Sequence, residues 1–167
     1  MTVGELVRVA RGVSTGNKAL YTMTRAEAKE RGLEAFVKPL LGGARELPEE
    51  GKAVVHDHAD RMVVLMASRR DVDQHPALAA YLGNAEPKFS QVQPAPIAAT
   101  YVGIPRFVAN PDGLIITNSL YTATPRKNLN AKEIAALVER LNNAAAKLPK
   151  PRFAARYSPR ALEALSV

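Results

Sequence analysis

Two short stretches of the sequence combine residue types that could do chemistry. The first, residues 11–18, holds two glycines, two hydroxyls and one amide between Arg11 and Lys18. Such a segment can approach a phosphate backbone closely and can offer Asn17 or Lys18 to the edges of bases. The same composition is equally typical of a hairpin connection. The stretch therefore indicates either a nucleic-acid contact or an ordinary turn.

The second stretch is His56-Asp57-His58, followed by Asp60. Histidines that alternate along a strand place two imidazoles on one face, as a metal site can use. No third ligand at a suitable spacing is evident, so a solvated turn before an apolar strand is the simpler interpretation. A metal-dependent nuclease that uses His56, His58 and Asp60 remains the less favoured alternative.

Other familiar chemistries are excluded by what the sequence lacks. There is no cysteine, so neither a disulfide framework nor a thiolate ligand or nucleophile is available. The glycine-rich phosphate loops of nucleotide-binding proteins and the Gly-x-Ser-x-Gly elbow of hydrolases are also missing.

The charge of the chain is strongly uneven. Residues 1–83 hold 12 basic and 11 acidic residues, a net of +1, whereas residues 84–167 hold 11 and 5, a net of +6. Such asymmetry points to an anionic partner, with nucleic acid first and a membrane surface second. The longest apolar runs, such as residues 62–67, are far shorter than the ~20 residues of a membrane span, and no signal peptide is evident at Met1. We therefore expect a cytoplasmic protein with no membrane association.

The elements that must position these residues fit one domain over residues 1–167, since a domain averages ~150 residues. Capping boxes at Thr24 with Glu27 and at Asn130 with Glu133 predict helices, as do Pro76 and the Ser158-Pro159 pair. Residues 35–52 and 86–105 are expected to be loops. Strands are expected at residues 5–10, 19–23, 61–67, 106–110, 114–118, 120–124 and 153–157. The predicted fold class is α+β, with short mixed or antiparallel strands and segregated helices.

Several motifs, taken in order, resemble the target-recognition domain of adenine-specific N6 DNA methyltransferases. The opening Arg11-Gly12-Val13-Ser14-Thr15-Gly16-Asn17 turn is similar to that family's turn, as is the Leu20-Tyr21-Thr22-Met23-Thr24 stretch after it. The later pieces are Phe36-Val37-Lys38-Pro39-Leu40, His75-Pro76-Ala77-Leu78, Tyr81-Leu82, Arg106-Phe107, Asn118-Ser119-Leu120-Tyr121 ahead of Pro125-Arg126, Leu141-Asn142-Asn143, and the tail 152–165. The resemblance spans nearly the whole chain.

The sequence departs from the family in two ways. It has no tryptophan, which family members usually carry in the region that matches residues 88–105. It also lacks both the Asn/Asp/Ser-Pro-Pro-aromatic tetrapeptide that grips a flipped adenine and a glycine-rich S-adenosylmethionine turn; Asn110-Pro111-Asp112-Gly113 is not that tetrapeptide. The resemblance therefore implies a recognition module without activity or cofactor of its own, whose catalytic partner binds S-adenosylmethionine.

Under this interpretation the partners are double-stranded DNA and a methyltransferase catalytic domain or subunit. Side chains of the turn are expected to contact the groove and backbone, namely Arg11, Ser14, Thr15, Asn17 and Lys18. Phosphate contacts are expected from Arg106, Arg126, Lys127, Arg152, Arg156 and Arg160. The main alternative is a general nucleic-acid module for RNA or DNA, although only 5% of the residues are aromatic and none form the paired pattern of RNA-binding sheets.

Overall fold

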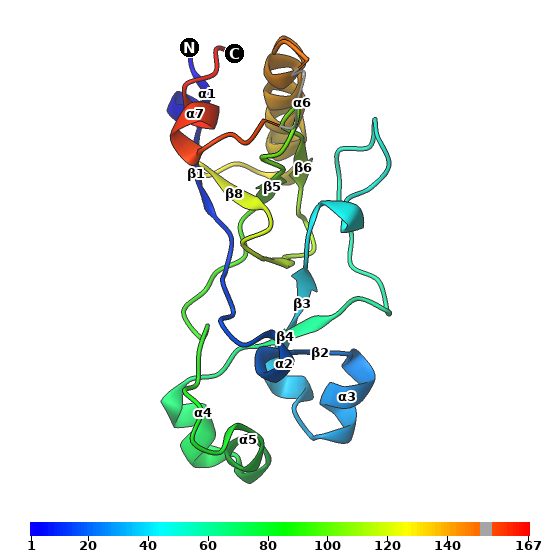
Figure 1. Cartoon of the computed structure of the whole chain (residues 1–167), viewed down its shortest axis with the longest axis vertical. Helices are drawn as coiled ribbons and strands as arrows, with labels where there is room; N and C mark the ends of the chain where they lie inside the picture. The colour runs from blue at the N-terminus through cyan, green and yellow to red at the C-terminus, as the bar shows by residue number, and fades with distance from the viewer. Residues whose placement is uncertain (151–154) are drawn as a thin grey trace.

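The computed structural model describes residues 1–150 and 155–167 and confirms the α+β class. Two four-stranded sheets lie one beyond the other along the long axis of the molecule (Figure 1). The first sheet is antiparallel throughout and has the strand order β1-β8-β5-β6. Its strands are β1 (Val7–Arg11), β8 (Tyr121–Pro125), β5 (Ile97–Ala99) and β6 (Phe107–Ala109).

Three helices pack on this first sheet: α1 (Val3–Leu6), α6 (Ala131–Ala146) and α7 (Pro159–Glu163). The long helix α6 buries one apolar face against the sheet, through Ile134, Leu137, Val138 and Leu141. Its capping box forms as expected, because the Asn130 side chain accepts from Glu133 N–H and the Glu133 carboxylate accepts from Asn130 N–H.

The second sheet has the order β2-β4-β3-β7, with β3 and β7 parallel and the other pairs antiparallel. Its strands are β2 (Thr22–Met23), β4 (Val63–Leu65), β3 (Val37–Leu41) and β7 (Ile115–Ile116). Around it lie α2 (Lys18–Tyr21), α3 (Arg25–Glu30), η1 (Glu34–Phe36), η2 (Ala44–Glu46), α4 (Arg69–Gln74) and α5 (Pro76–Leu82). All of these helices except η2 enclose, together with β2 and β4, a separate apolar core.

A third apolar cluster joins the two sheets. Leu41 of the second sheet packs there with Ala98 and Val108 of the first, and with Leu114 and Leu120 of the connections between them. The two sheets therefore share buried surface. No helix within the described residues is long and apolar enough to cross a membrane.

Two strands were wrongly predicted as loops. β3 lies within residues 35–52 and β5 lies within residues 86–105. β3 contains Pro39, and β5 is a three-residue strand that follows Pro96, so neither shows a local alternation. Pairing with distant strands on both sides is what makes each of them a strand.

Other element boundaries also differ from the prediction. The strand expected at 5–10 begins at Val7, after the turn of helix α1. Most of the strand expected at 19–23 is instead α2, because the Asn17 side chain accepts a hydrogen bond from Leu20 N–H. α4 was missed, although Ser68 and Asp71 form a capping box in front of it. The first part of the strand expected at 153–157 lies outside the described residues.

Candidate nucleic-acid interface

The turn after β1 is pressed directly against residues 116–120. Val13 N–H donates to the Ile116 carbonyl at 2.7 Å, and Asn118 N–H donates back to the Val13 carbonyl at 2.9 Å. Gly12 makes this approach possible, because a Cβ there would lie 2.0 Å from the carbonyl oxygen of Thr117. The first glycine of the turn is therefore required by close packing.

Beyond Val13 the turn projects into solvent. Ser14, Asn17 and Lys18 are exposed and Thr15 is half-buried. Asn17 uses its side-chain oxygen to cap α2, at 3.2 Å from Leu20 N, so only its amide nitrogen remains for an outside partner. The structure thus gives Asn17 a local structural role that sequence reasoning did not anticipate.

A shallow cavity of about 110 Å³ lies under the turn, and six of the nine residues that line it have polar side chains. Thr15 and Lys18 meet Thr117, Asn118 and Ser119 there. An adjoining cavity brings Lys18 near Glu46, whose carboxylate is already bound by Arg61 and by Gly42 N–H. Hydroxyls, an amide and an ammonium therefore converge at one exposed place.

Lys88 is a residue of this surface that sequence reasoning missed. Its Nζ lies 5.2 Å from the centroid of the Tyr21 ring, and a Cβ at Gly16 would lie 3.7 Å from that Nζ. The next residue, Phe89, has φ +69°, the sole positive φ at a non-glycine in residues 1–150 and 155–167. Its ring packs edge-on against Tyr21, with centroids 5.4 Å apart. A strained backbone thus places a lysine beside the turn.

Two more segments adjoin the turn through Tyr101. The Tyr101 hydroxyl donates to the Asn118 carbonyl at 3.2 Å, and its ring stacks on that of Tyr121 at 4.3 Å. Val102 pairs with Arg156 in an isolated antiparallel bridge, so the exposed Arg156 lies beside the segment that carries Tyr101. Burial raises the pKa of the Tyr121 hydroxyl, and the charge of Arg11 opposes that rise.

We call this surface the turn face. It comprises residues 11–18, 101–103, 117–119 and 155–157 together with Lys88. Its cationic side chains are Arg11, Lys18, Lys88 and Arg156, all of them exposed. It therefore unites predicted residues of the turn with one predicted phosphate contact and one unpredicted lysine.

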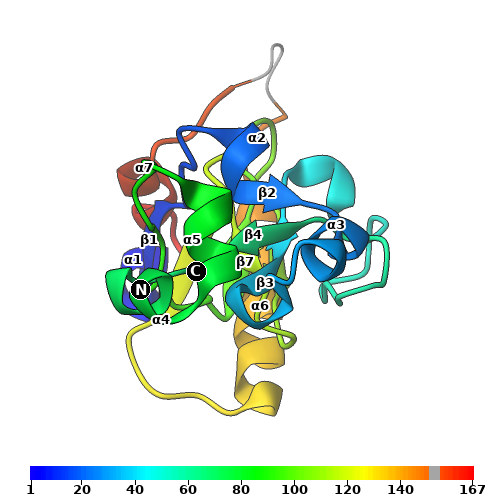
Figure 2. The same ribbon diagram turned by 90° about the horizontal axis from the view of Figure 1, so that it is seen from below.

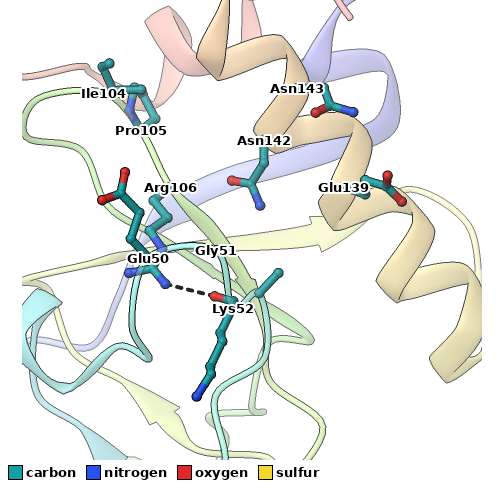
Figure 3. Close-up of a pocket in the computed structure, with 10 residues that line it drawn as sticks. Glu50, Gly51, Lys52, Ile104, Pro105, Arg106, Glu139, Asn142 and Asn143 are labelled. Carbon is teal, nitrogen blue, oxygen red and sulfur yellow. Dashed lines mark hydrogen bonds between the residues drawn. The ribbon is translucent and has the colours of Figure 1, made fainter.

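Three of the other predicted phosphate contacts, Arg106, Arg126 and Lys127, do not join the turn face. Arg106 directs Nη2 to the carbonyls of Glu49 and Lys52, at 2.6 and 2.8 Å, and so anchors a loop. Figure 3 shows the bond to Lys52. Arg126 donates from Nε to the Gly4 carbonyl at 2.6 Å. The connection from β8 to α6, which carries Arg126 and Lys127, lies on the opposite side of the view from α2 (Figure 2). Arg160 is exposed on α7, and Arg152 lies outside the described residues.

A larger cavity, of about 410 Å³, lies between residues 50–53, residues 104–106 and α6 (Figure 3). Asn142 reaches across it to the edge strand β6, where its oxygen accepts from Phe107 N–H and its nitrogen donates to the Phe107 carbonyl. The side chain thus completes the hydrogen bonds of a sheet edge. Both Asn142 and Arg106 therefore use their polar groups to hold the fold.

The histidine cluster is a loop anchor in this structure. His56 Nδ1 lies 3.2 Å from Asp112 Oδ2, and Asp57 N–H donates to that same oxygen at 2.8 Å. Asp57 is paired with Arg25, while His58 and Asp60 are exposed. Across residues 1–150 and 155–167, no three histidine or carboxylate side chains are grouped so that they could hold a metal ion.

Arg61 ties the same loop to the core. Its side chain is only 2% exposed, and it lies 3.1 Å from Glu46 and 3.6 Å from Asp57 while donating to the His56 carbonyl. A buried guanidinium needs such partners. The sequence marks this arginine only by its position ahead of an apolar strand.

No family model matches the sequence.

Proposed function

We propose that this chain is the DNA target-recognition part of an adenine-N6 DNA methyltransferase or restriction-modification enzyme of the cytoplasm. A separate S-adenosylmethionine-dependent catalytic domain or subunit would transfer the methyl group, because the sequence lacks both motifs for that chemistry. The observation that carries the proposal is the turn face, where the turn that resembles the family's carries the exposed Arg11 and Lys18 and is joined by the exposed Lys88 and Arg156 of other segments.

The turn face supports a division between positioning and base recognition. Arg11, Lys88 and Arg156 are suited to phosphates, which carry no base identity. Lys18 and the amide nitrogen of Asn17 project from the turn itself and are suited to the edges of bases in the major groove. Ser14 and Thr15 offer hydroxyls beside them.

Arg106 and Arg126 fit this division less well than the sequence suggested. The Arg106 guanidinium is engaged by two carbonyl groups, and Arg126 is directed to Gly4. We therefore propose Lys88 and Arg11, rather than Arg106 and Arg126, as the main phosphate contacts.

Fluorescence anisotropy with labelled nucleic acids tests the proposal. The isolated chain should bind duplex DNA weakly, near the ~10⁻⁴–10⁻⁶ M of non-specific contacts, with an affinity that falls steeply with salt. Single-stranded RNA should compete poorly; equal or better binding of RNA would favour the general nucleic-acid module. Absence of salt-dependent binding to both duplex DNA and RNA would refute the recognition module and the general nucleic-acid module alike.

Calorimetric titration with S-adenosylmethionine should give no heat of binding, since the cofactor belongs to the partner. Micromolar binding would contradict a recognition module. In the assembled enzyme, Lys18→Ala should cost ~1–3 kcal/mol of binding to the cognate duplex only, so that discrimination against mismatched duplexes falls. An equal loss on every duplex would place Lys18 at a phosphate instead.

A further inference from the structure

A groove of about 360 Å³ lies between the N-terminal segment, the connection from β8 to α6, and α6 itself. Its floor is apolar and includes Leu6, Leu129 and Leu137. Its rim carries the cationic side chains of Arg126, Lys127 and Arg140. Since the connection from β8 to α6 lies opposite α2 in Figure 2, the groove is separate from the turn face.

The rim cations are not neutralised within the described chain. None of the ion pairs among residues 1–150 and 155–167 includes Arg126, Lys127 or Arg140. Arg126 donates only its Nε to the Gly4 carbonyl, and Arg140 lies 3.5 Å from the sulfur of Met1. The terminal nitrogens of Arg126 and the Lys127 ammonium are therefore directed toward solvent or a partner.

Two carboxylates also line the groove, but both already accept hydrogen bonds at helix starts. Glu5 accepts from Thr2 N–H, and this bond holds the pKa of Glu5 below its ordinary value. Glu133 accepts from Asn130 N–H at 2.8 Å in the capping box of α6. Each carboxylate lies at a helix start, where backbone N–H groups and the helix dipole offset its negative charge, and the three cationic side chains outnumber the two carboxylates on the rim.

A nucleic-acid backbone does not fit this combination. Phosphates carry no apolar side chains that could cover the floor of Leu6, Leu129 and Leu137. Protein partners, in contrast, bring both apolar and charged side chains, and a groove with an apolar floor suits the apolar face of an amphipathic segment. The leucine side chains of the floor and the cationic side chains of the rim together favour a segment that carries both apolar and acidic side chains.

We infer that this groove binds an acidic amphipathic segment of a partner protein, with apolar side chains on Leu6 and Leu129 and carboxylates at Arg126, Lys127 and Arg140. Arg126 and Lys127, which the sequence suggested for DNA, thereby serve a protein contact. The inference does not depend on DNA recognition, because the groove and the turn face lie on different sides.

The test uses a labelled synthetic amphipathic peptide with a leucine face and a glutamate face, and a matched peptide with lysine in place of glutamate. In fluorescence anisotropy the glutamate peptide should bind about tenfold more tightly than the lysine peptide. The variant Arg126→Gln/Lys127→Gln/Arg140→Gln should lose that preference. The control Lys132→Gln/Lys147→Gln, which changes two lysines at other positions next to or on α6, should keep it.

Two further arms keep the inference falsifiable. Leu129→Ala removes apolar surface from the floor of the groove. It should weaken binding of the glutamate peptide without changing the preference for glutamate over lysine. Unlabelled duplex DNA should not displace the peptide. Equal binding of both peptides, no binding of the glutamate peptide, an unchanged triple variant, or displacement by DNA would each overturn the inference, whether or not the chain recognises DNA.

Discussion

Two groups of cationic side chains differ in where their charge is directed. Arg61 and Arg106 hold partners inside the fold: Arg61 binds Glu46, Asp57 and a carbonyl, and Arg106 binds two carbonyls of the 49–52 loop. Arg11, Lys18 and Lys88 stand instead at the exposed turn face. The first group fixes the loop between β3 and β4, whereas the second leaves its charge available to a ligand.

This difference shows that the net charge of +7 does not equal the positive charge that is exposed to a binding partner. Burial decides which cations need internal acceptors, because an unpaired buried charge is costly. Only cations left in solvent can release counterions from DNA when they bind phosphates. Substitutions in each group test whether buried and exposed cations differ in this way.

The largest effect is expected from Arg61→Ala. Removal of this buried guanidinium leaves Glu46 and Asp57 without their shared partner and should lower the free energy of unfolding by about 3 kcal/mol. Urea denaturation followed by circular dichroism measures this value. Arg25→Ala is the matched control, since its pair with Asp57 is more exposed and should cost no more than about 1 kcal/mol. Equal losses would remove the distinction between the buried and the exposed cation.

A somewhat smaller effect is expected from Gly12→Ala. The added Cβ would lie 2.0 Å from the Thr117 oxygen, so the turn must move, at a cost of about 2 kcal/mol, and duplex binding should weaken as the turn face is distorted. Gly43→Ala is the control, because its Cβ would meet only the Ser119 Cβ at 3.8 Å and its backbone is extended. Thermal unfolding and anisotropy of both variants give the comparison. If Gly43→Ala were the more damaging, the turn would not be packed as described.

Charge removal at the turn face should have a moderate effect on DNA binding alone. Arg11→Gln and Lys88→Gln should each reduce the slope of log affinity against log salt by ~0.9, so that the loss of affinity between 50 and 200 mM salt becomes about threefold smaller. Arg106→Gln should lower stability yet leave the slope unchanged, because its guanidinium is held by Glu49 and Lys52. A slope change in Arg106→Gln equal to that in Lys88→Gln would show that internal anchoring does not withdraw a cation from DNA.

The smallest effect concerns Asp112, which anchors the histidine loop. Asp57 N–H, aided by His56, lowers the pKa of Asp112. A carboxyl with a lowered folded pKa stabilises the fold above its unfolded pKa, and this contribution disappears as the pH falls through the folded value. Asp112→Asn should therefore lower the melting temperature slightly at neutral pH and not in acid. Asp60→Asn, at an exposed position in the same loop, should show no such difference.

Four helices were predicted because their start signals are local. The capping boxes at Thr24 and Asn130, the proline that opens α5, and the Ser158 cap of α7 all form where the sequence places them. Helices α1, α2 and α4 also begin with cap residues, at Thr2, Asn17 and Ser68, but were missed, and α2 was predicted as a strand. Strands β3 and β5 offered no comparable signal, since Pro39 interrupts one and the other spans three residues.

The candidate site divides in the same way. The composition of the turn singled out Arg11, Lys18 and their neighbours, and the structure does place them at an exposed surface. Lys88 escaped notice because it reaches the turn from 70 residues further along the chain through the packing of Phe89 on Tyr21. Arg106 and Arg61 could not be distinguished from surface cations by sequence, because their acceptors are backbone carbonyls and carboxylates of other segments.

Residue types and local patterns were enough to predict the fold class, four helix starts, the apolar strand β4 and the cationic excess of the second half, since each depends on residue type or on contacts within a few positions. Three features depend on the tertiary structure alone. These are the strands with which β3 and β5 each pair in their own sheet, the acceptor or solvent toward which each cationic side chain points, and the assembly of the turn face from five segments. The physical reason is that strand pairing and charge burial are settled by partners remote in sequence, which no local pattern encodes.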